Sequence, residues 1–220
     1  MTRTIPTPAA AVPLVLDALD LAALVGAAGW SRLPAAVRRR FGRGHGAATY
    51  VGRMALRCSP AGRVFAALAR AFGSPLSGAT NDAVPASVRV SDDGRGGMVW
   101  ERSIHTSGPG RPHVVRSIKQ VGASGLEERT DGGLGMSLRA FEESGALVFE
   151  SHAFFFAVGR LRLRVPVLLT PGTCRVVHTD LGGGLFRFDL DLVHPLWGRT
   201  FHQSGVFADP VADVVEGGAR

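Results

Sequence analysis

The spacing of hydrophobic residues divides the chain into two parts. In the first third, apolar side chains recur every three or four positions, which is the spacing of one face of an α-helix. Residues 50–57 alternate loosely between apolar and polar and predict a strand within this region. The predicted helices run from Leu14 to the breakers Gly26 and Gly29, from Pro34 to Phe41, and from Pro60 to Gly73.

The third predicted helix has the clearest limits. Ser59 is a suitable N-cap, Pro60 is preorganised for a first helical turn, and Gly73 followed by Pro75 ends the helix. One face of this helix is apolar and consists of Val64, Phe65, Leu68 and Phe72.

From about Pro85 onward the period changes to two, the period of a β-strand. Turn residues interrupt this part at short intervals, as in Asp131–Gly133 and Gly182–Gly184. Short strands without helix-length gaps are typical of antiparallel neighbours. We therefore predict an α+β fold, in which N-terminal helices precede a long antiparallel β-meander of eight or nine strands. A sheet of that size tends to curl, so a barrel or half-barrel is expected.

Alternation also assigns strand faces. Residues 161–165 alternate Leu or Val with Arg, as expected for a strand with one face toward solvent. Residues 186–192 alternate Phe or Leu with charged residues in the same way.

We assign residues 1–220 to one domain, with a helical segment at about 10–75, an antiparallel β segment at about 85–208 and a tail at 209–220. The apolar stretch from Pro8 to Gly29 contains Asp17 and Asp20 near its middle, and only Arg3 precedes it. These features predict neither a signal peptide nor a membrane span.

The net charge of +7 comes from 24 arginines and one lysine against 18 acidic residues. The densest basic cluster, Arg38–Arg40 with Arg43, is interpreted as a solvated helix end. Stacking aromatic residues do not interleave with it, so no nucleic-acid partner is predicted. The two cysteines, Cys58 and Cys174, are ordinary thiols of a reducing compartment, and we expect a cytoplasmic protein.

Sequence motifs for cofactors and metals give no positive match. The chain has no phosphate-binding loop, no dinucleotide fingerprint between a strand and a helix, and no helical His-x-x-x-His pair. Its seven histidines are scattered. We predict no cofactor and no metal.

Arg102 interrupts an apolar strand face that it shares with Met98, Trp100 and Ile104. A buried guanidinium requires an anionic partner, which is either a ligand or a core carboxylate such as Glu127 or Glu150. Glu150 and His152 share a second face with Phe154 and Phe156, and this face is either an outer surface or a barrel lumen. The predicted ligand-binding residues are Trp100, Arg102, Glu150, His152, His194 and His202.

The segment 176–207 holds the candidate catalytic residues. His178 and Asp180 share one strand face, and Arg187 lies on the next strand if Gly182–Gly184 forms a hairpin. A histidine held by a carboxylate is the arrangement of a general base, and a nearby arginine stabilises developing negative charge. The same arrangement is also that of an ordinary polar pair between strands.

Several segments resemble a family. The chain is similar to the bacterial "domain of unknown function 4166" family over about 26–209. The resemblance implies a metabolic accessory role, because the family occurs both alone and behind saccharopine-dehydrogenase-like oxidoreductase domains. It assigns no catalytic residue, and no dinucleotide-binding half is expected here. The matching segments are Gly29–Pro34, Thr49–Met54, Trp100–Arg102, Gly133–Met136, Leu168–Gly172 and Phe186–Leu196.

Three functional hypotheses follow. The leading one is non-catalytic binding of a small, partly apolar molecule with an acidic head, which predicts a closed pocket containing Arg102. An enzyme predicts an open cleft that converges on His178. A module that docks onto an oxidoreductase predicts a flat apolar patch without a pocket.

Overall fold

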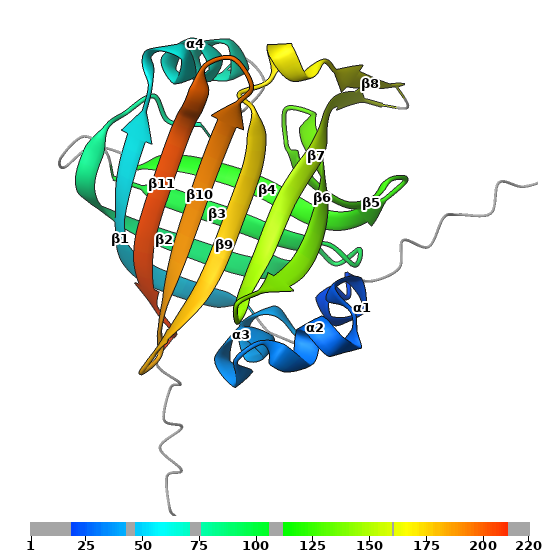
Figure 1. Ribbon diagram of the computed structural model, residues 1–220, viewed down its shortest axis with the longest axis vertical. Coiled ribbons are helices and arrows are strands. Elements are labelled where there is room, and N and C mark those ends of the chain that lie inside the picture. The colour runs from blue at the N-terminus through cyan, green and yellow to red at the C-terminus, as the bar shows by residue number, and fades with distance from the viewer. Residues whose placement is uncertain (1–18, 43–46, 71–75, 106–111, 160, 211–220) are drawn as a thin grey trace, which may run out of the picture.

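The computed structural model describes residues 19–42, 47–70, 76–105, 112–159 and 161–210 (Figure 1). Helices occupy the N-terminal part, as predicted, and one short 3₁₀ helix, η1, follows later. The helices are α1 (Leu21–Val25), α2 (Ala27–Arg32), α3 (Ala35–Phe41), α4 (Pro60–Arg70) and η1 (Val167–Leu169). Among the described helices, none combines the length and apolar character required to cross a membrane.

The first predicted helix is divided in two. Gly26, with a φ of 80°, ends α1, but Gly29 lies inside α2 and does not end a helix as predicted. The Asp20 side chain caps α1 by accepting a hydrogen bond from the Ala23 amide at 3.2 Å. The predicted start at Leu14 lies outside the described residues.

Within the described residues, eleven antiparallel strands form one sheet, in which ten strands close a barrel. The barrel confirms the predicted α+β meander, although ten strands, and not eight or nine, follow residue 80 in the described part of the chain. β7 pairs with β6 on one side, and on the other side with β9 near its start and with β8 near its end. The strands are β1 (Ala48–Cys58), β2 (Asn81–Asp92), β3 (Met98–Ile104), β4 (His113–Gly122), β5 (Gly125–Thr130), β6 (Leu134–Glu143), β7 (Ala146–Val158), β8 (Leu161–Val165), β9 (Thr173–Gly182), β10 (Leu185–His194) and β11 (Gly198–Ala208).

Helices lie at both ends of the barrel (Figure 1). At the end occupied by α1–α3, Phe41 enters the interior, where its ring stacks on Trp100 at 5.8 Å between centroids. At the other end, α4 crosses the mouth. Ser59 caps α4 by accepting a hydrogen bond from the Gly62 amide, as predicted. A Cβ at Gly62 would lie 2.3 Å from the Thr200 carbonyl oxygen, so only glycine allows α4 to approach β11 this closely.

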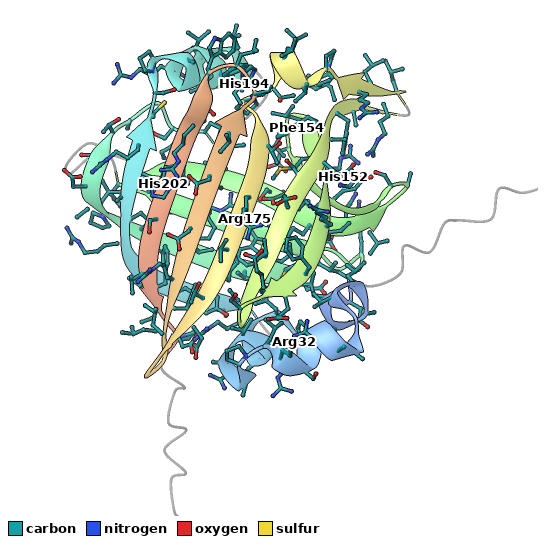
Figure 2. The ribbon with its side chains drawn as sticks, in the orientation of Figure 1. Arg32, His152, Phe154, Arg175, His194 and His202 are labelled. Carbon is teal, nitrogen blue, oxygen red and sulfur yellow. The ribbon has the colours of Figure 1, made fainter. Side chains whose placement is uncertain are left out.

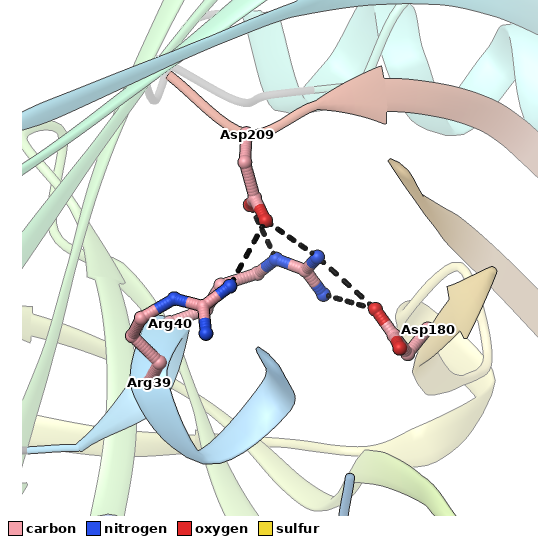
Figure 3. Close-up of polar contacts among 4 residues, drawn as sticks. All are labelled: Arg39, Arg40, Asp180 and Asp209. Carbon is pink, nitrogen blue, oxygen red and sulfur yellow. Dashed lines mark hydrogen bonds and ion pairs between the residues drawn. The ribbon is translucent and has the colours of Figure 1, made fainter. Parts of the chain in front are cut away.

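The arginine cluster of α3 is not a solvated helix end throughout, so that interpretation is wrong for Arg40. The Arg40 side chain is buried and donates to Asp180 of β9 and to Asp209 after β11 (Figure 3). Arg38 and Arg39 are exposed, whereas Arg43 lies outside the described residues. Although burial lowers the pKa of Arg40, the two carboxylates outweigh this effect and raise it.

Candidate ligand-binding cavity

A cavity of about 330 Å³ occupies the half of the barrel nearer α4. This volume lies within the range of roughly 300–1,000 Å³ for small-molecule sites. Most of its wall is apolar, and Phe65, Leu68 and Ala69 of α4 close part of its mouth. Apolar side chains of the barrel wall include Ile104, Met136, Phe154, Phe156, Val176 and Leu192.

A bulge in β7 brings two of these rings inside. Ser137 of β6 pairs with Ala153, whereas the next residue, Leu138, pairs with Ser151, so His152 is an extra residue. The extra residue reverses the alternation, because a shift of one position exchanges the faces of a strand. Phe154 and Phe156 line the cavity as a result. His152 is exposed (Figure 2).

The prediction that Glu150 and His152 share a face with these two rings is therefore wrong. Glu150 precedes the bulge and lies on the outer wall. There it forms ion pairs with Arg139 of β6 and Arg175 of β9, its direct neighbours across the sheet. Neither Glu150 nor His152 reaches the interior cavity beside α4.

Four polar side chains cluster on adjacent strands β3, β4 and β5, and three of them, Arg102, Ser117 and Glu128, form the polar floor of the cavity. Glu128 accepts hydrogen bonds from Arg102 at 3.2 Å and from Ser117 at 2.6 Å. The Lys119 Nζ lies 2.8 Å from its second carboxylate oxygen. Lys119 and Glu128 are only 5 % and 6 % exposed. Arg102 therefore points inward as predicted, but its carboxylate partner is Glu128 and not Glu127 or Glu150.

Electrostatics hold Glu128 in its ionised form. Burial raises the pKa of its carboxyl group, but Lys119 and Arg102 outweigh burial and bring the pKa down to about 2. Burial and the nearby Arg102 lower the pKa of Lys119, against the attraction of Glu128. Two basic groups thus share one carboxylate inside the barrel. With both bases protonated, the cluster carries one uncompensated positive charge.

Arg102 also borders a smaller cavity of about 30 Å³ on the side of α3. This space is large enough for two or three water molecules, since one requires roughly 10–15 Å³. Trp100 and His178 line it, and their Nε1 and Nδ1 atoms have no hydrogen-bond partner among the described residues. Arg102 therefore separates an apolar cavity from a small space bordered by two unpaired polar atoms.

The three candidate catalytic residues do not converge. His178 is buried, and burial followed by the positive charges of Lys119 and Arg102 lowers its pKa to about 3. Asp180 bonds to Arg40 and not to His178. Gly182–Gly184 does form the predicted hairpin, but Arg187 is exposed on the opposite face of β10 from Phe188, the partner of His178.

The two remaining predicted ligand residues lie elsewhere. His194 is buried, but its Nδ1 accepts from the backbone amides of Leu196 and Trp197. This ring therefore holds the turn between β10 and β11. His202 lies on the outer wall and pairs with Asp191 at 3.0 Å. No three His, Cys, Asp or Glu side chains in the described ranges gather as metal ligands would.

Comparison with protein families gave one match. The family described as Domain of unknown function (DUF4166) matches residues 33–207, which include α3, α4 and nearly the whole barrel. The chain belongs to the DUF4166 family. Comparison with curated proteins gave no match.

In this DUF4166 domain, sequence reasoning missed Lys119, Ser117 and Glu128. A signal for Lys119 exists, because it is the only lysine in a chain that otherwise uses arginine. It also follows Val115 and Ser117 at alternate positions of β4, on the buried face. Glu128 carries no such signal, since the neighbouring Glu127 is also buried but forms its ion pair with Arg162.

Proposed function

We propose that this domain binds a small, partly apolar molecule with an acidic head, without transforming it chemically. The observation that carries the proposal is the floor of the cavity, where Arg102 and Lys119 share the single carboxylate of Glu128. The acidic head would lie at this floor and the apolar part would extend toward α4. A ligand anion there balances the second buried positive charge.

Arg102 is the better placed of the two bases to contact a ligand. Lys119 is held over the rings of Trp100 and Phe149, at 4.7 and 5.4 Å from their centroids. Arg102 lines the cavity, and its one hydrogen bond to a described residue goes to Glu128. A guanidinium has five N–H donors, so four are left for a carboxylate, which it binds in bidentate geometry.

The geometry favours binding over the two other hypotheses. His178, the candidate base, is enclosed by aromatic rings and lies in no open cleft. A module that docks onto an oxidoreductase requires no interior cavity, whereas this barrel has one lined by Arg102. Cytoplasmic location remains a prediction from the sequence.

Isothermal titration with decanoate and its neutral counterpart decanol tests the proposal. Wild-type protein should bind decanoate more tightly than decanol. Arg102→Met should weaken decanoate binding about 10- to 100-fold, the range for a lost charge-assisted hydrogen bond, and leave decanol binding nearly unchanged. The matched control is Arg89→Met on the neighbouring strand β2, where Arg89 is exposed.

Arg102→Met leaves Lys119 and Glu128 as a balanced pair, so we expect the variant to fold. Its melting temperature should confirm this. Equal decanoate affinities in wild type and Arg102→Met, or no decanoate binding by the wild type, would contradict the proposal.

A further inference from the structure

Large apolar side chains are exposed around the cavity mouth. They come from α4, from β8 and η1, and from the turn between β10 and β11. More than half of the exposed large apolar side chains of the described residues lie in these elements. We call this set the apolar rim. It consists of Val64, Leu68, Leu161, Leu163, Val167, Leu168, Leu169, Leu196 and Trp197.

Contacts join the parts of the apolar rim into one surface. The Trp197 ring packs on Phe65 of α4 at 5.6 Å and stacks on His194 at 4.2 Å. The Nε2 of His194 lies 3.4 Å from the Leu168 carbonyl oxygen, which connects the turn to η1. Figure 1 shows α4, the short yellow helix η1 and β8 along the same end of the barrel.

The cavity opens through the apolar rim. Leu68 and Leu169 both line the cavity, yet they are 65 % and 69 % exposed. Val165 of β8 lines it as well, and Leu161 and Leu163 continue the same strand face outward. The apolar face of β8 is thus exposed. The alternation of leucine with arginine predicted instead that this face packs in the core.

Positive charge accompanies the apolar rim. Arg63 and Arg70 of α4 and Arg164 of β8 are exposed, and none has a carboxylate partner among the described residues. Two nearby arginines, Arg57 and Arg162, do have one. The chain as a whole carries +7. Separate apolar protrusions with a tryptophan and neighbouring arginines suit an anionic lipid surface, where such side chains enter the headgroup boundary.

We propose that the apolar rim docks this domain onto the surface of an anionic lipid membrane. In this orientation the cavity mouth faces the lipid, so an apolar ligand passes between bilayer and barrel without crossing water. The inference goes beyond ligand binding, because it depends on the exposed rim and its arginines and not on Arg102.

Vesicle sedimentation tests the inference. The full chain is mixed with vesicles of phosphatidylcholine alone, or of equal parts phosphatidylcholine and phosphatidylglycerol. Binding to the anionic vesicles at low ionic strength is expected, with a decrease at high salt. Leu168→Ser/Leu196→Ser, at two rim residues that do not line the cavity, should lower the partition coefficient at least about tenfold, since each leucine loses apolar contact with lipid. The control Val51→Ser/Val206→Ser alters exposed apolar residues of the barrel wall and should bind normally.

The arginines and Trp197 provide independent readouts. Arg63→Gln/Arg70→Gln/Arg164→Gln should reduce binding roughly fivefold for each arginine, whereas Arg89→Gln should not. Trp197 fluorescence should shift to shorter wavelength on anionic vesicles, and Trp197→Phe should lose this shift.

Three results would overturn membrane docking. These are no sedimentation at low salt, binding that the rim serine variant retains, or a dimer in light scattering that the same variant dissociates. The last result would assign the rim to a second copy of the chain. The rim variant should still bind decanoate. A failure of membrane docking can therefore be distinguished from a failure of ligand binding.

Discussion

His178 has an unusual environment for an ionisable residue. Five aromatic rings surround its imidazole, contributed by Phe41, Trp100, Phe149, Phe186 and Phe188. Burial, then Lys119 and Arg102, lower its pKa to about 3. The imidazole is therefore neutral in the folded protein at any ordinary pH, and it acts as one more ring of the aromatic cluster.

This low pKa predicts a loss of stability in acid. The unfolded imidazole takes up a proton near pH 6.5, whereas the folded one does so near pH 3, so the unfolded state binds more protons between these values. Stability therefore falls as the pH drops through this window. At pH 5 the loss from His178 should be about 2 kcal/mol relative to pH 8.

Urea unfolding at pH 8 and pH 5 measures this effect. His178→Phe should lose about 2 kcal/mol less than wild type between the two pH values, because phenylalanine does not titrate. The exposed His105→Gln should behave like wild type. If wild type and His178→Phe lose the same free energy of unfolding between pH 8 and pH 5, the pKa of His178 is not lowered in the folded protein.

Arg40 connects a helix to the barrel. Its guanidinium joins α3 to Asp180 of β9 and to Asp209 beyond β11 (Figure 3). Only 9 % of Arg40 is exposed, while the two carboxylates are partly exposed. The connection fixes the helical segment against two strands that lie far from it in the sequence.

Arg40→Leu should therefore destabilise the fold by about 2–3 kcal/mol. This is less than the 3–5 kcal/mol for breaking a fully buried pair, because water reaches both carboxylates. Arg38→Leu, on an exposed position of the same helix, should stay within about 0.5 kcal/mol of wild type. Urea unfolding measures the free energy of unfolding of both variants. Equal losses would mean that the ion pairs of Arg40 do not stabilise the fold.

Strands and their turns could be predicted because their signals are local. The three glycines of Gly182–Gly184 all have positive φ, which favours glycine, and they form the predicted hairpin. Alternation alone predicts that Arg102 points inward. One extra residue reverses every strand face after it. The bulge at His152 could not be predicted, because the run Phe154–Phe156 is apolar at every position and hides this reversal.

The sequence predicts a barrel or a half-barrel, but the strand pairings that close the barrel lay beyond sequence reasoning. Val51 of β1 pairs with Ala208 of β11, and β9 pairs with β7 although β8 separates them in the sequence. Pairings of this kind depend on the packed interior and not on neighbouring residues. For the same reason, the partner of Arg102 could be narrowed to a core carboxylate but not identified as Glu128.

The described barrel has its shortest seam between β5 and β6, and its next shortest between β7 and β9. β5 and β6 share three register pairs, Glu127–Ser137, Glu128–Met136 and Arg129–Gly135, whereas β6 and β7 pair along the full length of β6. Fewer shared hydrogen bonds make a seam easier to open locally.

Hydrogen exchange should therefore be fastest at this seam. Amides of Glu127–Arg129 should exchange faster than the central amides of β10 and β11, which pair along their lengths. Exchange followed by mass spectrometry of peptides from these strands measures the difference. Equal protection of the seam and of β10–β11 would mean that the barrel opens only as a unit.

β8 gives the molecule a property that a closed barrel otherwise lacks. In the described sheet it is the one strand with a neighbour on a single side, so its outer backbone groups are available to another chain. Its sequence alternates leucine with arginine, and Arg164 is exposed without a carboxylate partner among the described residues, whereas Arg162 pairs with Glu127. When two copies approach edge to edge, their Arg164 side chains carry like charges and repel. We expect Arg164 to oppose growth of the sheet from one molecule into the next.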